Sequence, residues 1–163
     1  MMLIRKAQRK DIQELLDIYN YEVIHGVATF DIDCKTMEEW TNWFDEHQEP
    51  YVIYVSEING CIAGYASLSK YRYKQAFDST VELSVYVNPL YRNQQVASKL
   101  MEAVIEYASK NNIHTIVSVI TSGNTVSEYL HKKFHFEYCG TIREVGYKMN
   151  QYLSIDHYQI ILK

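Results

Sequence analysis

A strand that runs into a long helix through a short turn, near the middle of the chain, constrains the fold more than any other segment. Residues 79–87 alternate as a strand does, and the strand must end at Asn88-Pro89 because proline cannot donate to a ladder. Apolar residues then recur at helical spacing over residues 96–108. The turn gathers backbone N–H groups and the positive end of a helix dipole, and Arg92 adds a charge, so it is suited to a pyrophosphate. A solvated arginine on an ordinary strand–turn–helix explains the same residues.

Two capping patterns predict two helices in the N-terminal third of the chain. Asp11 precedes Glu14 by three residues, and apolar residues follow at helical spacing until Gly26. Thr36 and Glu39 repeat the pattern before a short aromatic helix. We therefore expect both helices to begin with a reciprocal capping box.

Runs of β-branched and aromatic residues predict the strands. The strongest hairpin signal is Asn59-Gly60, which lies between expected strands over residues 51–58 and 61–69. The other expected strands cover residues 2–6, 113–120, 136–145 and 155–162, and a last helix covers residues 124–133. The predicted order is strand, two helices, three strands, helix, strand, helix and two strands, which is an α/β protein.

Length, charge and cysteine usage exclude several classes of function. A chain of 163 residues suffices for one core, so a single domain over residues 1–163 is expected. The formal net charge of -4 provides no basic surface for nucleic acid. No apolar run suits a signal peptide or a membrane span, so we expect a cytoplasmic protein with no membrane partner. The three separated cysteines are expected to be reduced thiols, although a nucleophilic cysteine stays open.

The central turn resembles the co-substrate-binding signature of the GNAT superfamily, in which Arg or Gln, two residues, Gly, one residue and Gly or Ala follow each other. The matching residues are Arg92, Gln95 and Ala97. The resemblance implies a GNAT (acyl-CoA N-acyltransferase) fold, with a mixed, mostly antiparallel sheet flanked by helices, and acetyl-CoA as co-substrate. Gln95 replaces the family glycine, which tolerates φ > 0 and lets the backbone approach the pyrophosphate closely. We therefore expect weaker co-substrate contacts at this position.

The resemblance extends over nearly the whole chain to the branch that contains phosphinothricin and methionine-sulfoximine acetyltransferases. Its marks are Trp40, Trp43 and residues 18–21, 28–31, 80–87, 123–127, 130–131 and 140–148. It implies transfer of an acetyl group from acetyl-CoA to the amino group of a small amino-acid-like substrate, by direct attack in a ternary complex. Acetylation of a protein N-terminus, a polyamine or an antibiotic amine, and CoA binding without catalysis, are the alternative functions.

Glu82 stands where that branch has its catalytic residue. A carboxylate can take the proton that an amine must lose before it attacks a thioester, and an apolar strand would raise the pKa of the carboxyl. A carboxylate that faces solvent from a half-buried strand is the alternative interpretation. The family also implies a splayed strand whose free backbone N–H near Val85 or Tyr86 points at the thioester oxygen.

His131 falls where the branch commonly has a histidine that would protonate the leaving thiolate. A protonated imidazole suits this role near neutral pH, whereas a surface histidine is the alternative. His131 and His135 also have the spacing of a metal pair on a helix. No glutamate lies between them and no third ligand is evident, so no metal is expected.

By resemblance, the co-substrate contacts the catalytic strand, the turn after it and the start of a later helix. The residues assigned to it are Val85, Tyr86, Val87, Arg92, Asn93, Gln94, Gln95, Val96, Ala97, Ser98, Asn124 and Ser127. Asn124 could equally serve only as a helix N-cap, with Ser127 at the N3 position.

The loop before the catalytic strand provides candidates for substrate binding. Arg72 and Lys74 resemble the arginine-rich loop of the branch and could hold a substrate carboxylate, although Asp78 replaces a further family arginine. Phe30 and Tyr147 are candidate walls of the pocket. Solvated loop charges and ordinary core or surface aromatics are the alternatives. The branch also implies a homodimer with this loop near the interface.

Overall fold

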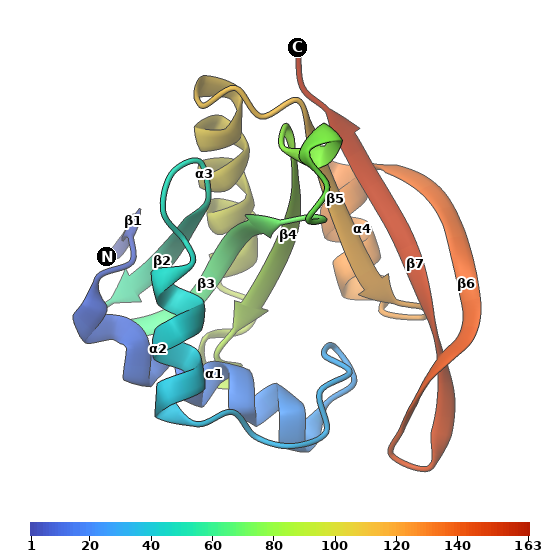
Figure 1. Ribbon diagram of the computed structural model, residues 1–163. Coiled ribbons are helices and arrows are strands. Elements are labelled where there is room, and N and C mark those ends of the chain that lie inside the picture. The colour runs from blue at the N-terminus through green and yellow to red at the C-terminus, as the bar shows by residue number, and fades with distance from the viewer.

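The computed structural model describes residues 1–163 and contains one seven-stranded sheet (Figure 1). The strands are β1 (Met2–Lys6), β2 (Val52–Ile58), β3 (Cys61–Lys70), β4 (Thr80–Val87), β5 (Thr115–Thr121), β6 (Glu137–Lys148) and β7 (Gln151–Ile161). Their order across the sheet is β1-β2-β3-β4-β5-β7-β6. Only β4 and β5 pair in parallel; all other neighbours are antiparallel. The mixed, mostly antiparallel sheet confirms the predicted fold class.

Helices cover both faces of this sheet (Figure 1). They are α1 (Ile12–His25), α2 (Met37–Asp45), α3 (Val96–Lys110) and α4 (Thr125–Lys133). The apolar stripe of α3 packs with β3, β4 and β5 in the larger core, whereas α1 and Trp40 of α2 pack with β2 and β3 in a second core on the opposite face. The predicted order of strands and helices is confirmed. No helix combines the length and apolar character needed to cross a membrane.

The two strands at the centre of the sheet separate before they end. The β4–β5 ladder runs from Thr80 opposite Thr115 to Leu83 opposite Ser118 and stops there. β4 continues to pair with β3 on its other side, up to Val87 opposite Gly64. In Figure 1 the ends of β4 and β5 diverge, which opens the middle of the sheet. The expected splayed strand is therefore present.

The first of the two predicted capping boxes is wrong and the second is confirmed. The Asp11 carboxylate accepts from Arg5 Nη1 at 2.7 Å and from Gln8 N at 2.7 Å, so it does not cap α1. Glu14 instead accepts from the backbone N–H of Ile62 at 2.8 Å. A charged guanidinium and a strand N–H are the stronger donors for these two carboxylates.

In the second capping pattern, Thr36 and Glu39 form both bonds of a capping box at the start of α2. This helix is therefore anchored by its own sequence.

Two details near the C-terminus differ from the prediction. β6 and β7 are longer than expected and meet at Met149 and Asn150, which have φ values of 51° and 58°. Both residues are in the left-handed region that a tight hairpin turn requires, without the glycine that usually marks it. His135 lies beyond the end of α4 with φ 66°, so it does not share a helical face with His131.

Candidate active site

A cavity of about 620 Å³ lies where β4 and β5 separate. Its walls come from the ends of these strands, from the turn before α3 and from one side of α4. Every residue that the sequence assigned to the co-substrate lines it, except Gln94, which is exposed. The walls also include Glu22 of α1, Ser118 and Thr121 of β5, and Tyr129 of α4, which the sequence did not single out.

The exposed edge of β4 supplies hydrogen-bonding groups to this cavity. Residues Ser84 to Val87 have β3 as a neighbour on one side and no partner on the β5 side. In an antiparallel pair, alternate residues direct their N–H and C=O groups away from the partner strand. The edge therefore offers both donors and acceptors to an extended, amide-containing chain and one N–H to a developing oxyanion.

The turn between β4 and α3 is shaped by two residues in the left-handed region. Asn93 and Gln95 both have φ 62°, and Gln95 is the N-cap residue of α3. Asparagine tolerates this conformation, whereas glutamine adopts it at a cost because its Cβ approaches the following carbonyl. The position thus requires the backbone geometry for which the family uses glycine, and Gln95 adopts that geometry with a side chain attached.

The only charged pair in the cavity wall joins this turn to α1. Arg92 Nη2 lies 3.1 Å from Glu22 Oε1, and the Glu22 side chain is only 16% exposed. The cation that the sequence assigned to a pyrophosphate therefore already has a protein anion beside it. Glu22 is also the group that a side chain at Gly26 would strike, since a Cβ there would lie 2.0 Å from Glu22 Oε2.

Glu82 lies on the face of β4 opposite the α3 core. Its neighbours Val81 and Leu83 are buried against α3, while Glu82 is half-buried and lies opposite Ser69 of β3 and Val117 of β5. Burial raises the pKa of the Glu82 carboxyl, and the positive charges of His157 and Arg72 oppose this shift. The carboxylate is thus neither fully solvated nor neutralised by an ion pair. Both interpretations of Glu82, the catalytic and the solvent-facing one, therefore stay predictions.

His131 is buried, not a surface residue, with 3% of its area exposed. Its Nδ1 lies 2.7 Å from the Ser127 carbonyl oxygen, so Nδ1 carries the proton and donates it. Nε2 lies 2.7 Å from Ser118 Oγ and therefore accepts from that hydroxyl. Burial lowers the pKa of His131, so the ring is neutral at neutral pH. This finding does not support a protonated imidazole.

Asn124 and Ser127 serve the helix and the cavity at once. Asn124 Oδ1 accepts from the backbone N–H of Ser127 at 3.1 Å, which is the N-cap bond of α4. Both side chains also line the cavity. The cap interpretation of Asn124 is therefore confirmed, and its contact with a co-substrate stays a prediction.

The four residues assigned to substrate binding do not converge. Phe30 packs on β6, where a Cβ at Gly146 would lie 2.4 Å from the Phe30 ring. Tyr147 points to the other side of β6, is 56% exposed and packs against Tyr152 with the two rings tilted. Arg72 and Lys74 are exposed in the β3–β4 loop. Arg72 lies over the rings of Tyr71 and Phe77, at 5.1 Å and 5.8 Å from their centroids. Of these four, Arg72 is the one whose positive charge lowers the pKa of the Glu82 carboxyl.

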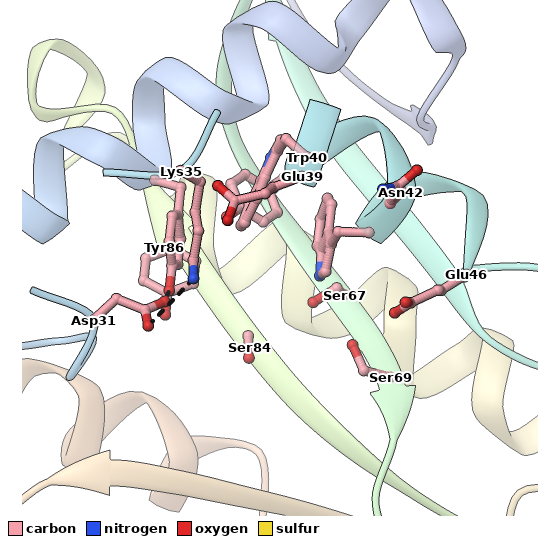
Figure 2. Close-up of a pocket in the computed structure, with 13 residues that line it drawn as sticks. Asp31, Lys35, Glu39, Trp40, Asn42, Glu46, Ser67, Ser69, Ser84 and Tyr86 are labelled. Atoms are coloured by element: carbon pink, nitrogen blue, oxygen red, sulfur yellow. Dashed lines mark hydrogen bonds and ion pairs between the residues drawn. The ribbon is translucent and has the colours of Figure 1, made fainter. Parts of the chain in front are cut away.

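Two further cavities lie beside the first. One, of about 480 Å³, lies under α2, and it shares Ser84 and Tyr86 with the cavity between β4 and β5 (Figure 2). The other, of about 390 Å³, lies over β5, β6 and β7 and is lined by Val117 and His157. Glu82 of β4 lies opposite Ser69, which lines the cavity under α2, and opposite Val117, which lines the cavity over β5, β6 and β7. It therefore lies between these two cavities. Sequence reasoning missed His157, since nothing in its local pattern connects it to Glu82.

The sequence matches the family described as Acetyltransferase (GNAT) domain over residues 4–158. It is 32% identical to the L-methionine sulfoximine/L-methionine sulfone acetyltransferase of Salmonella typhimurium, over 99% of this chain and 95% of that protein. It is 33% identical to the phosphinothricin N-acetyltransferase of Streptomyces coelicolor, over 96% of this chain and 94% of that protein. The solved structure of yncA from Salmonella typhimurium with its cofactor acetyl-CoA matches with a TM-score of 0.96 and 32% identity, covering 99% of this chain and 94% of that one.

Proposed function

The chain belongs to the GNAT acetyltransferase family, and we propose that it transfers the acetyl group of acetyl-CoA to the amino group of a small amino-acid-like substrate. The observation that carries the proposal is the position of Glu82 beside the unpaired edge of β4. A base and an edge that can bind an extended acyl carrier lie on the same strand. Relatives that act on phosphinothricin and on methionine sulfoximine point to an amino-acid-like acceptor.

The residues of the β4–β5 cavity fit acetyl-CoA. The free edge of β4 at Val85 and Val87 suits the amides of a pantetheine chain, because both can pair with backbone groups. The N-terminus of α3, with the backbone N–H groups of residues 93–98 and the Arg92 charge, suits a pyrophosphate. Asn124 and Ser127 lie across the cavity from this turn and would hold the carrier from the α4 side. Acetyl-CoA supplies the activated acyl group.

Glu82 acts as the general base in this proposal. An amine arrives largely protonated at neutral pH, and Glu82 takes its proton directly or through water. The nitrogen then forms a bond to the acyl carbon as the C–S bond breaks. The β4 backbone near Val85 and Tyr86 stabilises the negative charge that develops on the carbonyl oxygen, because an N–H fixed in a strand needs no reorganisation.

The leaving sulfur needs a proton as the C–S bond breaks. His131 lines the cavity and was assigned this role, but its ring is neutral and both nitrogens are already bonded. A His131→Gln variant tests the assignment: a donor role lowers kcat, whereas a role in packing lowers only the free energy of unfolding. Comparing kcat with the thermal unfolding midpoint separates the two.

Assembly and domain organisation form a second part of the proposal. Tyr138, Tyr147 and Tyr152 lie on one face of β6 and β7 and are each more than half exposed, and we propose that this face pairs two copies in a homodimer. We also propose that residues 1–163 form one domain, since a single sheet includes strands from both ends of the chain. The cytoplasmic location expected from the sequence stays a prediction. Sedimentation velocity of the wild type and of Tyr152→Lys tests the dimer.

The proposed activity is tested by thiol release from acetyl-CoA. The panel contains phosphinothricin, methionine sulfoximine, methionine sulfone, common amino acids, spermidine and an aminoglycoside. Release with amino acids or their analogues alone supports the proposal. Thiol release only with the aminoglycoside or spermidine indicates an antibiotic amine or a polyamine as the acceptor. Binding of acetyl-CoA without any thiol release indicates a protein that binds CoA without catalysis.

A further inference from the structure

The cavity under α2 has a polar floor made by three facing pairs on β3 and β4. Tyr65 lies opposite Tyr86, Ser67 opposite Ser84, and Ser69 opposite Glu82. Residues directly opposite each other in a ladder share one face of the sheet. All of these except Glu82 line the cavity, and Glu82 lies at the end of the row. The floor therefore leads from the proposed base into the cavity.

The floor contains hydroxyls without a partner in the protein, among them the buried Tyr65 Oη. Ser67 is 2% exposed and lines the cavity, yet its hydroxyl makes no hydrogen bond, and the Ser84 hydroxyl makes none either. Ser69 differs, because His47 Nδ1 donates to the Trp43 carbonyl and Nε2 must then accept from Ser69 Oγ at 2.8 Å. A buried hydroxyl without a partner costs free energy. Ser67 is thus a polar group placed in the cavity floor without a protein partner.

Aromatic rings form the wall above this floor. Trp40 stacks on Tyr19 and on Trp43, with ring centroids 4.4 Å apart in both cases. Trp43 in turn meets the edge of Tyr65 at 5.8 Å. Faces of electron-rich rings attract cations, and tryptophan does so most strongly. The wall therefore favours an organic cation with an alkyl stem.

The charges at the rim are mostly negative, and one of them is free. Asp31 lies 3.6 Å from Lys35 Nζ and also accepts a hydrogen bond from the Tyr19 hydroxyl. Glu39 accepts from the backbone N–H of Thr36 in the capping box of α2. Glu46 forms no ion pair and no side-chain hydrogen bond, although it lines the cavity. Figure 2 shows Glu46 extending toward Ser69 on the side of the cavity away from Asp31 and Lys35. An uncompensated carboxylate thus lies at the end of the aromatic wall.

We propose that this cavity binds the side chain of the acceptor, with a distal ammonium or guanidinium group beside Glu46. The inference rests on the proposed function: the reacting amine lies near Glu82 and Ser84, the alkyl stem passes over Ser67, and Trp43 covers it. The substrate class is a basic amino acid with an unbranched side chain, such as lysine, ornithine or arginine. The exposed Arg72, which acts on Glu82 through its charge, remains available to the carboxylate.

The test compares L-lysine with L-norleucine, which has a side chain of similar shape and no distal charge. Wild-type protein is expected to show a kcat/KM at least about tenfold higher for lysine, as one charge-assisted contact provides. Glu46→Gln is expected to remove this preference. Glu38→Gln is the matched control, since Glu38 is an exposed carboxylate of the same helix that lines none of the three cavities described.

Equal kcat/KM for the two amino acids in the wild type, or a lysine preference that persists in Glu46→Gln, overturns the inference and leaves the proposed function intact. If no amino acid is acetylated, the proposed function fails. Calorimetric titration with lysine and with norleucine then tests the cavity alone: tighter binding of lysine that Glu46→Gln abolishes supports it, and equal or absent binding overturns it. Ser67→Val replaces the floor hydroxyl by methyl groups. It should lower kcat/KM or the binding affinity for lysine without lowering the unfolding midpoint.

Discussion

Arg92 Nη2 and Glu22 Oε1 lie 3.1 Å apart in the wall of the β4–β5 cavity, so the cation nearest the proposed pyrophosphate position is already paired. Acetyl-CoA must compete for Arg92 and must bring its own negative charges close to Glu22. The ion pair is therefore expected to weaken the binding of acetyl-CoA. Its Arg92 member is 53% exposed, which limits the size of the effect.

Replacing Glu22 by Gln is accordingly expected to lower KM for acetyl-CoA, by up to about fivefold at low ionic strength. The difference should shrink as salt is added, because the interaction is screened. Steady-state kinetics at varied acetyl-CoA measures it, with Glu102→Gln, an exposed acid of α3, as control. A higher KM in Glu22→Gln would show instead that Glu22 positions Arg92 for the co-substrate.

Gln95→Gly is expected to stabilise the protein and to tighten acetyl-CoA binding. At φ 62° the glutamine side chain costs about 1 kcal/mol relative to a residue without a Cβ, and its removal lets the helix N-terminus approach an anion more closely. Chemical denaturation and a thermal shift with acetyl-CoA measure the two effects. Gln94→Gly, next to it and outside the cavity, should give neither gain. An unchanged affinity in Gln95→Gly would mean that the site has adapted to the glutamine.

Glu82→Gln is expected to lower kcat by at least roughly 100-fold, because the amide cannot accept the proton of the amine. Binding of acetyl-CoA, followed by thermal shift, should persist in the variant. Retention of most of the wild-type kcat would remove Glu82 from the mechanism.

The pH dependence of the wild type follows from the same carboxylate. Burial raises the pKa of Glu82, and the base is active only when ionised, so kcat/KM should fall as the pH decreases through this raised value. Arg72 opposes the shift, and Arg72→Met should therefore move the acidic limb to higher pH. The pH profile of each protein, measured with one acceptor, checks the sign; a limb that moves to lower pH would contradict the assignment.

Asn124 offers a way to separate its two roles. Asn124→Ala is expected to lower the free energy of unfolding by about 1 kcal/mol, because α4 loses its N-cap, whereas Asn124→Ser keeps a capping oxygen. If the amide also contacts acetyl-CoA, KM should rise in both variants. If KM for acetyl-CoA rises in Asn124→Ala but not in Asn124→Ser, Asn124 acts only as the N-cap of α4.

Local patterns were sufficient to predict the order of the helices and strands. The hairpin at Asn59 and Gly60, the capping box of α2 and the strand that ends at Pro89 each depend on residues close together in the chain. The family signature added the residues around Arg92. The separation of β4 from β5 came from the resemblance alone, and the ladder confirms it.

Features that depend on contacts between distant segments could not be predicted. Asp11 is diverted from its helix by Arg5, which periodicity does not reveal. The burial of His131 depends on Ser118 of β5, and the His157 charge near Glu82 depends on the order of strands at the far edge of the sheet. The cavity under α2 combines a loop, two helices and five strand positions. Each segment alone is an ordinary amphipathic element.

The β4–β5 ladder is the shortest strand pairing in the sheet, and the β4–β5 cavity lies where it ends. The four-stranded half with β1–β4 and the three-stranded half with β5–β7 share only four residue pairs at their junction. A bound acyl carrier would take the place of the missing ladder, and a ligand at 100 times its Kd adds about 2.7 kcal/mol to the free energy of unfolding. The resistance of this protein to proteolysis in the cell should therefore rise and fall with the supply of acetyl-CoA.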